Sequence, residues 1–530
     1  MHPVLINGQW KPSRGTNSFQ AVNPGTRQTL PGEFPISPWE EVEEALQAAA
    51  GAFEIVRNWP GERFATFLER MAEEIESRAA QIVEAAHQET ALPVSPRLKD
   101  AELPRTTNQL RQAALAARDG SWKMATLDTA ANLRTQLAAL GPVAVFGPNN
   151  FPCAFNSIAG GDFAAAIAAG NPVLGKGHPS HPETTRLFGE AAQAAAVVTE
   201  MPPGFVQLIY HTDHENGTKL VSHPLLAATG YTGGRHSGLI LKAAADQAGK
   251  LFYAELSSIN PLYILPGVLK ERLETMVSEF VSSSLMGTGQ FCTNPGLVAL
   301  QAGDLTEMFI AGVAEKFSSA PAGTLLGAGT ESSLRAAVVA LQQAGALVVT
   351  GNQPVETGRY CFANTLLRVS AKAFLENPRG LQAEAFGNCA LMVVADTEEE
   401  LVQLADHFEG NLTGCLYTST NGDDDELYAR IEPGLRQKVG RLLNDKMPTG
   451  VAVSPAMNHG GPFPATSHPG FTAVGLPASL RRFAMLQCYD NVRPHRLPAT
   501  LQNANPTGTM WRQIDGIWTQ QGVEETGDSK

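Results

Sequence analysis

Apolar residues recur at helical spacing in the early part of the chain. They lie three and four positions apart, which places them on one face of a helix. The two sets are Val42, Ala45, Leu46, Ala49, Phe53 and Val56 in one helix, and Phe64, Phe67, Leu68, Met71, Ile75, Ile82 and Val83 in the next. Residues up to 34 have instead the pattern of short strands and turns. We interpret both helices as packing elements that carry no chemistry.

The pattern changes near residue 141, where short apolar runs begin to alternate with alanine-rich helices. The expected strands are residues 142–146, 172–174, 205–209 and 225–228, with helices at 161–169 and from 183 between them. This alternation favours a parallel sheet covered by helices, the usual setting of a dinucleotide site. A second α/β region begins near residue 256, with strands expected at 261–265 and 391–394. Segments 132–140 and 482–497 are candidates for an arm that pairs with a partner subunit.

Composition excludes some classes of partner. The 530 residues include 39 basic and 52 acidic side chains, a formal net charge of −13. This acidity disfavours binding to nucleic acid or to an anionic membrane, which needs a basic face. Glycine, proline and asparagine interrupt the uncharged stretch 135–161, so no membrane-spanning helix is expected there. The N-terminus lacks the pattern of a signal peptide, and the six cysteines form no CxxC pair. We therefore expect a cytoplasmic protein with reduced thiols.

Three residues are candidates for chemistry. Cys292 lies in the glycine-flanked segment 289–296, where tight turns permit close approach of a substrate. Glu255 ends an apolar strand, and Asn150 lies on a turn after another strand, where open α/β sheets bind ligands. Each has a structural alternative: a buried thiol, a solvated charge and a turn former between two prolines. Taken singly, these alternatives are favoured.

Taken together and in this order, the three residues resemble the aldehyde dehydrogenase superfamily, and the resemblance covers nearly the whole chain. The matching motifs are Asn150-Phe151-Pro152, Gly170-Asn171-Pro172-Val173 with Lys176, Thr232-Gly233-Gly234, Glu255-Leu256, Gly289-Gln290 with Cys292, Glu384 with Phe386-Gly387, and Pro462-Phe463. The resemblance implies an α/β aldehyde dehydrogenase fold assembled as a homodimer or homotetramer. Its expected parts are a Rossmann-like dinucleotide-binding domain (1–125 and 141–255), an α/β catalytic domain (256–480), a small β oligomerisation arm (126–140 and 481–500) and a C-terminal tail (501–530).

The resemblance also implies a mechanism, the NAD(P)-dependent oxidation of an aldehyde to a carboxylic acid. Cys292 as thiolate attacks the aldehyde carbon, and the Asn150 amide with the Cys292 backbone N–H holds the oxyanion. Hydride passes to the nicotinamide and leaves a thioester on Cys292. Glu255 activates the water that hydrolyses this thioester. Relatives that pass the acyl group to coenzyme A typically lack this glutamate, so Glu255 favours a free acid product.

Cofactor-binding residues follow from the same resemblance. Lys176 is expected to bond the adenosine ribose, and Glu384, in a motif with Phe386, the nicotinamide ribose. The backbone at Gly233 and Gly234 is expected to face the pyrophosphate.

The stretch after the lysine bears on the choice between NAD and NADP. NAD-specific relatives commonly place an acid three residues after the lysine, but this chain has Pro179 there. No carboxylate then repels a 2′-phosphate, Ser180 is placed to donate to it, and His214 lies where some NADP-using relatives carry an arginine. We predict use of both cofactors, with NADP preferred over NAD.

Within the superfamily the chain is most similar to the 2-oxoglutarate semialdehyde (2,5-dioxopentanoate) dehydrogenases of bacterial sugar-acid and hydroxyproline catabolism. The similar stretches are 30–34, 105–111, 175–178, 488–492 and 511–516. An anionic semialdehyde needs a cation at the mouth of its tunnel. Arg105 and Arg111 are the candidates, each with a helix-surface charge as the alternative. Ser454 and Phe463 are expected to be wall residues of the tunnel.

Other functions stay open at this point. Within the same class, the alternative is a broad aliphatic or fatty aldehyde dehydrogenase that uses NADP. Outside it, the alternatives are a non-catalytic binding protein on this fold and a thioester or ester hydrolase. We expect no metal site. The acidic run Asp423–Glu426 is interpreted as a solvated helix start rather than as a set of metal ligands. His459 and His468 are interpreted as loop polar groups that lack the spacing and carboxylate partner of a zinc pair.

Overall fold

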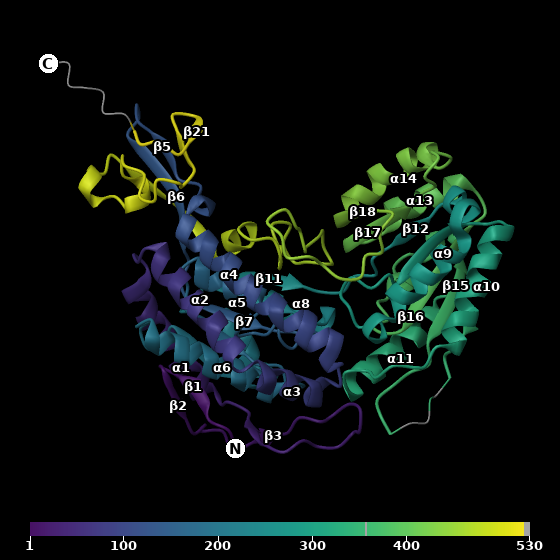
Figure 1. Ribbon diagram of the computed structural model, residues 1–530, viewed down its shortest axis with the longest axis horizontal. Helices are drawn as coiled ribbons and strands as arrows, with labels where there is room; N and C mark the ends of the chain where they lie inside the picture. The colour runs from purple at the N-terminus through teal and green to yellow at the C-terminus, as the bar shows by residue number, and fades with distance from the viewer. Residues whose placement is uncertain (354, 356–357, 524–530) are drawn as a thin grey trace.

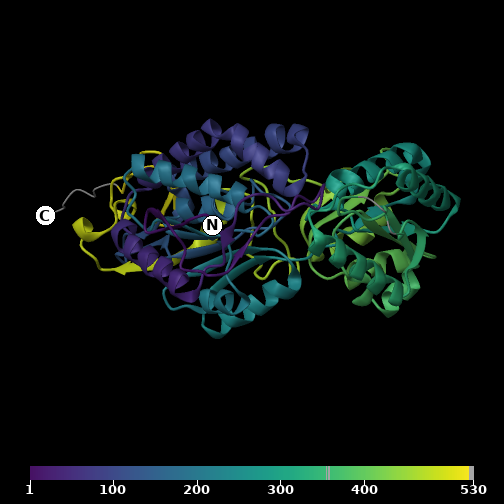
Figure 2. The ribbon, with the colours of Figure 1, turned by 90° about the horizontal axis from the view of Figure 1, so that it is seen from below.

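Two bodies, each built around its own sheet, lie side by side, and a smaller arm projects from one of them (Figure 1, Figure 2). The computed structural model describes residues 1–353, 355 and 358–523. The early part of the chain forms the first body, and the second body follows from β12 onward (Figure 1).

The first body is centred on a seven-stranded sheet of order β11-β10-β7-β8-β9-β1-β2. Its parallel strands are β7 (Val143–Phe146), β8 (Val173–Lys176), β9 (Val206–Ile209), β10 (Ala228–Thr232) and β11 (Leu251–Glu255), with β1 (Val4–Ile6) and β2 (Gln9–Lys11) antiparallel at one edge. The parallel strands are mostly buried because helices cover both faces of the sheet (Figure 2). These helices are α1 (Trp39–Val56), α2 (Gly61–Ser77), α3 (Ala79–Thr90), α4 (Leu103–Asp119), α5 (Gly161–Ala168), α6 (Pro182–Val198), α7 (His214–Ser222) and α8 (Arg235–Gln247). The second helix expected from the sequence is therefore two helices, α2 and α3, which are separated at Arg78.

The second body holds another seven-stranded sheet, of order β14-β15-β16-β13-β12-β17-β18, in which only β14 is antiparallel to its neighbour. Its strands are β12 (Leu262–Ile264), β13 (Leu297–Gln301), β14 (Leu347–Thr350), β15 (Thr365–Ser370), β16 (Cys389–Ala395), β17 (Asn411–Tyr417) and β18 (Val439–Asn444). Its helices are α9 (Pro266–Leu285), α10 (Asp304–Ser319), α11 (Ala328–Gln343), α12 (Ala371–Glu376), α13 (Glu398–His407) and α14 (Asp425–Lys438). The α/β fold expected from the sequence is confirmed.

The arm is a five-stranded sheet of order β19-β6-β5-β20-β21. Its strands are β5 (Thr126–Asp128), β6 (Leu133–Ala139), β19 (Ala484–Asp490), β20 (Arg512–Ile514) and β21 (Ile517–Thr519). The last two lie beyond residue 500, so part of the segment expected to be a tail belongs to the arm sheet. Arg512 is fully buried there and donates to the backbone carbonyls of Gln502 and Asn503, which ties these strands to the rest of the arm.

The chain returns to the first body before it enters the arm. Phe471, Val474 and Leu480 belong to the hydrophobic core of the first sheet, although they lie within 256–480, the range expected for the catalytic domain. The segment that follows β18 therefore passes from one body to the other.

The smaller elements complete the chain. A two-stranded sheet pairs β3 (Ser18–Phe19) with β4 (Phe34–Pro35). The short helical turns are η1 (Val94–Glu102), η2 (Ser121–Lys123), η3 (Met286–Gly289), η4 (Gly380–Gln382), η5 (Ala478–Phe483), η6 (Pro494–Arg496) and η7 (Ala499–Leu501). Across the part of the chain that the structure describes, no helix combines the length and the apolar character needed to cross a bilayer.

Candidate active site

The end of β11 and the loop after η3 bring a carboxylate and a thiol to one cavity. Glu255 is the last residue of β11 and is buried, whereas Cys292 lies just after η3 and is partly buried. Both line a cavity of about 820 Å³ whose walls come from both bodies. The two residues that the sequence assigns to nucleophile and base therefore meet at the junction of the two sheets.

A histidine lies between these two side chains. His459 Nε2 is 3.3 Å from Cys292 Sγ and 3.1 Å from Glu255 Oε1. The His459 backbone N–H donates to Thr472 Oγ1 at 3.0 Å, which fixes the loop that carries the ring. The expectation that His459 is a loop polar group without a carboxylate partner is wrong. Its partners lie 167 and 204 positions away along the chain, so no local spacing indicates the contact.

The thiol of Cys292 is held in its protonated form. Burial raises its pKa well above the ordinary value, and the charge of Glu255 and the hydrogen bond with it act in the same direction. The guanidinium of Arg105 acts in the opposite direction. Because the thiolate is the nucleophile, this thiol needs a base, and His459 Nε2 lies within reach of its proton.

Asn150 is placed beside the segment that carries the nucleophile. Its side chain is buried, and Nδ2 donates to the backbone carbonyl of Gln290 at 3.0 Å. An amide nitrogen carries two protons, so one remains for a substrate oxygen while the other holds the side chain in position. This geometry suits the oxyanion role expected for Asn150.

Arg105 presents a cation inside the protein without a bonded anion. Its guanidinium lies over the rings of Phe155 and Phe151, at 5.2 and 5.7 Å from their centroids. Nε and Nη2 are buried and have no hydrogen-bond partner among the described residues. Burial lowers the pKa of Arg105, and the charge of Cys292 in its thiolate form, followed by that of Glu102, opposes that effect. Burying such a cation without a partner costs free energy, so its free N–H groups remain available to an anion that reaches them.

The neighbouring arginines are committed to other partners. Arg97 forms an ion pair with Glu102 at 3.0 Å. Arg441, on β18, donates through Nη2 to two backbone carbonyls of the following loop, at 3.0 and 3.1 Å. Burial lowers the pKa of Arg441, and Cys292 in its thiolate form opposes this effect, which places Arg441 within electrostatic range of the nucleophile. The sequence analysis missed Arg441.

Three residues expected to contact substrate lie elsewhere. Arg111 is partly exposed and donates to both carboxylate oxygens of Glu76, at 2.6 and 2.9 Å, so it is the helix-surface charge of the alternative interpretation. Phe463 is 59% exposed. Ser454 accepts a hydrogen bond from the backbone of its own loop at 3.3 Å. None of the three, and not Arg105 either, is among the described residues that line the cavity with Cys292.

The residues expected to bind the cofactor lie along one groove. A cavity of about 440 Å³ adjoins the larger cavity and shares part of its wall. Lys176 and His214 line the smaller cavity, Ser180, Glu384 and Phe386 line the larger one, and Gly233 and Gly234 line both. The groove thus runs from the end of β8 to Cys292.

The start of α8 fits a pyrophosphate. This helix begins directly after Gly234 and has no side-chain cap, so its first N–H groups remain available to an anion. A Cβ at Gly233 would lie 2.7 Å from Tyr231 Oη, so a side chain there would collide with the wall of the groove.

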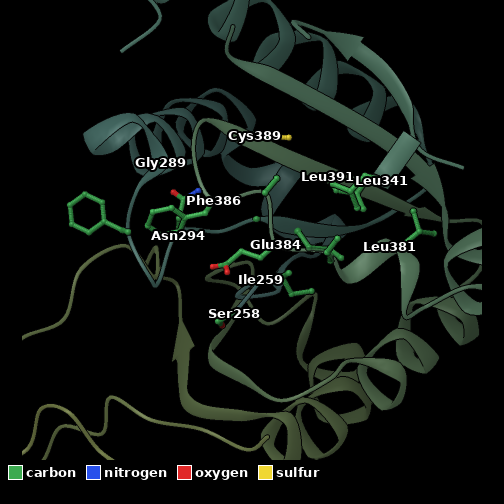
Figure 3. Close-up of a pocket in the computed structure, with 15 residues that line it drawn as sticks. Ser258, Ile259, Gly289, Asn294, Leu341, Leu381, Glu384, Phe386, Cys389 and Leu391 are labelled. Atoms are coloured by element: carbon green, nitrogen blue, oxygen red, sulfur yellow. The ribbon is translucent and has the colours of Figure 1, made fainter. Parts of the chain in front are cut away.

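Two groups in the groove have shifted pKa values. Burial lowers the pKa of Lys176 to about 8. Burial raises the pKa of Glu384 to about 7, although hydrogen bonds from Ser257 and the Ser258 backbone oppose the shift. Glu384 and Phe386 also line a small cavity together with Ser258 and residues that flank Cys292 (Figure 3).

Comparison with known proteins places this geometry in a family. The profile of the Aldehyde dehydrogenase family matches residues 10–438. "Alpha-ketoglutaric semialdehyde dehydrogenase 2" of Azospirillum brasilense is 40% identical over 89% of this chain and 91% of its own length. "Alpha-ketoglutaric semialdehyde dehydrogenase" of Acinetobacter baylyi is 34% identical over 97% of this chain and 98% of its own length.

Solved structures show the same fold. Lactaldehyde dehydrogenase from Escherichia coli has a TM-score of 0.79 at 23% identity, covering 92% of this chain and 98% of that one. A point mutant of betaine aldehyde dehydrogenase from Staphylococcus aureus, in complex with NAD+, has a TM-score of 0.78 at 18% identity and covers 93% and 98%. The chain belongs to the aldehyde dehydrogenase family. It is an NAD(P)-dependent aldehyde dehydrogenase.

Proposed function

We propose that this enzyme oxidises 2-oxoglutarate semialdehyde to 2-oxoglutarate. The observation that carries the choice of substrate is Arg105, a partly buried residue whose Nε and Nη2 are buried and unpartnered among the described residues and whose charge lies within electrostatic range of Cys292. The substrate has an aldehyde at one end and a carboxylate at the other, so one molecule can meet the thiol and the guanidinium together. The names of the Azospirillum and Acinetobacter relatives support the same substrate.

The first half of the reaction uses three side chains. His459 Nε2, 3.3 Å from Sγ, takes the proton of Cys292 as the sulfur attacks the aldehyde carbon. The free amide proton of Asn150 stabilises the negative charge that develops on the aldehyde oxygen. Arg105 holds the distal carboxylate, which fixes the direction in which the aldehyde enters. NAD(P) bound in the groove would supply the acceptor for the hydride that leaves the substrate carbon.

The second half releases the acid. Glu255 Oε1 lies 3.1 Å from His459 Nε2 and accepts from it once that nitrogen has taken the thiol proton, whereas the other oxygen, Oε2, has no partner among the described residues. Oε2 is therefore free to accept a proton from a water that attacks the acyl group on Cys292. Hydrolysis returns the thiol and releases the carboxylic acid.

NADP is the proposed preferred cofactor, with NAD also used. The smaller cavity is lined by Lys176 and by the histidines His178, His211 and His214. Its one acidic side chain among the described lining residues, Asp213, caps α7 by accepting from the backbone N–H of residue 216 at 2.7 Å. This arrangement provides donors for a 2′-phosphate. A higher kcat/KM for NAD than for NADP would contradict this part of the proposal.

We further propose a cytoplasmic homodimer or homotetramer joined through the arm. The arm carries exposed apolar side chains at Met485, Leu486, Ile517 and Trp518. Exposed apolar groups concentrated on one sheet are typical of an interface between subunits. Cys292 and Cys488 are free thiols, which suits a reducing compartment. Sedimentation of wild type beside Leu486→Glu tests the interface, since the variant should dissociate.

The experiment that tests the function compares two aldehydes. Initial rates of NADPH formation are measured with 2-oxoglutarate semialdehyde and with hexanal, an aldehyde that has no carboxylate. The proposal expects the higher kcat/KM for the semialdehyde. A preference for hexanal would keep the enzyme class and replace the substrate by an aliphatic aldehyde.

A further inference from the structure

The side chains that meet at the nucleophile also form a set of metal donors. A thiol sulfur, an imidazole nitrogen and a carboxylate oxygen, from Cys292, His459 and Glu255, all lie within 4.8 Å of one another. Zinc uses these three kinds of ligand atom in proteins. The residues come from three separate segments, which only the fold brings together.

The distances suit a single ion. Zinc–ligand bonds of about 2.0–2.3 Å at tetrahedral angles place neighbouring ligand atoms roughly 3.4–3.6 Å apart. Here Cys292 Sγ and His459 Nε2 are 3.3 Å apart, and His459 Nε2 and Glu255 Oε1 are 3.1 Å apart. Small side-chain movements would admit an ion between them. Glu255 Oε2 is buried and has no partner among the described residues, so the carboxylate has an oxygen to spare.

The site is also open on one side. Cys292 and Glu255 both line the cavity of about 820 Å³, which offers a path for the ion and a position for water. Three protein ligands and one open position for water are the coordination pattern of catalytic zinc sites, in contrast to the closed four-ligand shell of structural ones.

We propose that Cys292, His459 and Glu255 bind Zn²⁺ reversibly and that the bound ion inhibits the dehydrogenase. On binding, the S–H bond of Cys292 breaks, an S–Zn bond forms and the proton passes to solvent; no electron is transferred. The sulfur lone pair is then engaged with the metal and cannot attack an aldehyde. The His459 nitrogen that takes the thiol proton is occupied as well, so metal and substrate exclude each other.

A catalytic hydrogen-bond relay without metal affinity is the competing interpretation. Cobalt(II) distinguishes the two, because a cobalt–thiolate bond gives a near-ultraviolet charge-transfer band that a relay alone does not. The enzyme is reduced with a non-thiol reductant, freed of metal and titrated with CoCl₂ in the absence of aldehyde. The readout therefore does not depend on the identity of the substrate, and failure of the proposed function leaves this test intact.

The expected result is one cobalt ion per chain, with a thiolate band that Zn²⁺ displaces. Zn²⁺ should abolish the dehydrogenase rate over the same concentration range, and a chelator should restore it. Zn²⁺ should also protect Cys292 from alkylation by iodoacetamide, as measured by mass spectrometry on wild-type enzyme. This last measurement needs no variant, so it holds even where a variant fails to fold.

Variants assign the ligands. Cys292→Ser should remove the band, and His459→Gln should weaken Zn²⁺ binding at least about 10-fold, a loss that even outer partners of metal ligands cause. His468→Gln is the matched control: this histidine lies in the same loop region, is exposed and meets the ring of Tyr253 edge to face. Cys488→Ser, on the exposed β19, is the control for the thiol. A band that survives Cys292→Ser, or unchanged Zn²⁺ affinity in His459→Gln, would overturn the proposal.

Discussion

Replacing Arg105 by methionine tests how the enzyme selects a charged aldehyde. Methionine keeps much of the length of the side chain and its contact with the rings of Phe151 and Phe155, but it removes the cation. A hydrogen bond to a charged group contributes about 1.5–3 kcal/mol. Since 1.4 kcal/mol is a factor of ten, losing one such bond should lower kcat/KM for 2-oxoglutarate semialdehyde roughly 10- to 160-fold.

The same variant should gain stability while it loses specificity. Burial lowers the pKa of Arg105, because the fold disfavours the charged guanidinium, and two of its nitrogens have no partner among the described residues. A well-packed apolar side chain relieves that cost. We therefore expect an unchanged or higher midpoint of thermal unfolding for Arg105→Met without ligand.

The assay measures kcat/KM for the semialdehyde and for hexanal in both forms of the enzyme. Arg111→Met is the matched control, because Arg111 lies on the same helix but bonds Glu76 at the surface. Exposed ion pairs contribute about 0–1 kcal/mol, so the control should keep its preference between the two aldehydes. An equal loss on both substrates in Arg105→Met would refute a carboxylate-binding role.

The remaining predictions concern the base, the cofactor and a crowded turn. His459→Gln should lower kcat at least about 100-fold, as expected for loss of a general base. The variant should also slow the alkylation of Cys292 by iodoacetamide, because the thiol then lacks the base that takes its proton. Unchanged rates of turnover and alkylation would rule out proton transfer to this ring. The preference for NADP over NAD should fall as the pH rises through about 8, because Lys176 then loses the charge that attracts a 2′-phosphate. Steady-state kinetics from pH 7 to 9 measure the ratio of kcat/KM for NADP to that for NAD, and a ratio that does not change with pH would show that the lysine makes no contact with the phosphate. KM for NAD should rise as the pH falls through about 7, because protonation removes the ionised Glu384 that accepts from the ribose, and Glu384→Gln should abolish this dependence. Gly289→Ala should lower the free energy of unfolding by about 1–3 kcal/mol. Gly289 has a φ of +69°, and a Cβ added there would lie 2.1 Å from the carbonyl oxygen of Gly387. An unchanged midpoint of thermal unfolding would contradict this crowding.

The repeated strands and helices of both bodies were predictable because their signals are local. Apolar runs at 142–146 and 205–209 match β7 and β9 closely, since a buried parallel strand needs a continuous apolar stretch. The arm was less predictable. Arg512 is an arginine, a residue type that is usually exposed, but here it is buried and donates to the backbone carbonyl of Gln502. No periodicity in the sequence indicates this contact, which holds the last strands in the arm.

The residues of the candidate active site also fall into those that the sequence identifies and those that only the fold reveals. Cys292, Glu255 and Asn150 lie in motifs, so the resemblance to a family identified them. The role of His459 was predicted wrongly because its partners, Cys292 and Glu255, are distant in the sequence. Its position beside them depends on the path of a loop, which no periodicity in the sequence specifies. Arg105 and Arg111 are equivalent in the sequence, six positions apart on α4, and only the packing shows that Arg105 has buried, unpartnered nitrogens whereas Arg111 is paired with Glu76.

The most direct test of the account is the ratio of kcat/KM for 2-oxoglutarate semialdehyde to that for hexanal, with NADP saturating. We expect this ratio to be roughly 10 or more in wild-type enzyme, the contribution of one charged hydrogen bond, and to fall toward 1 in Arg105→Met. A ratio of 1 or below in wild type would contradict the claim that Arg105 selects a carboxylate-bearing aldehyde.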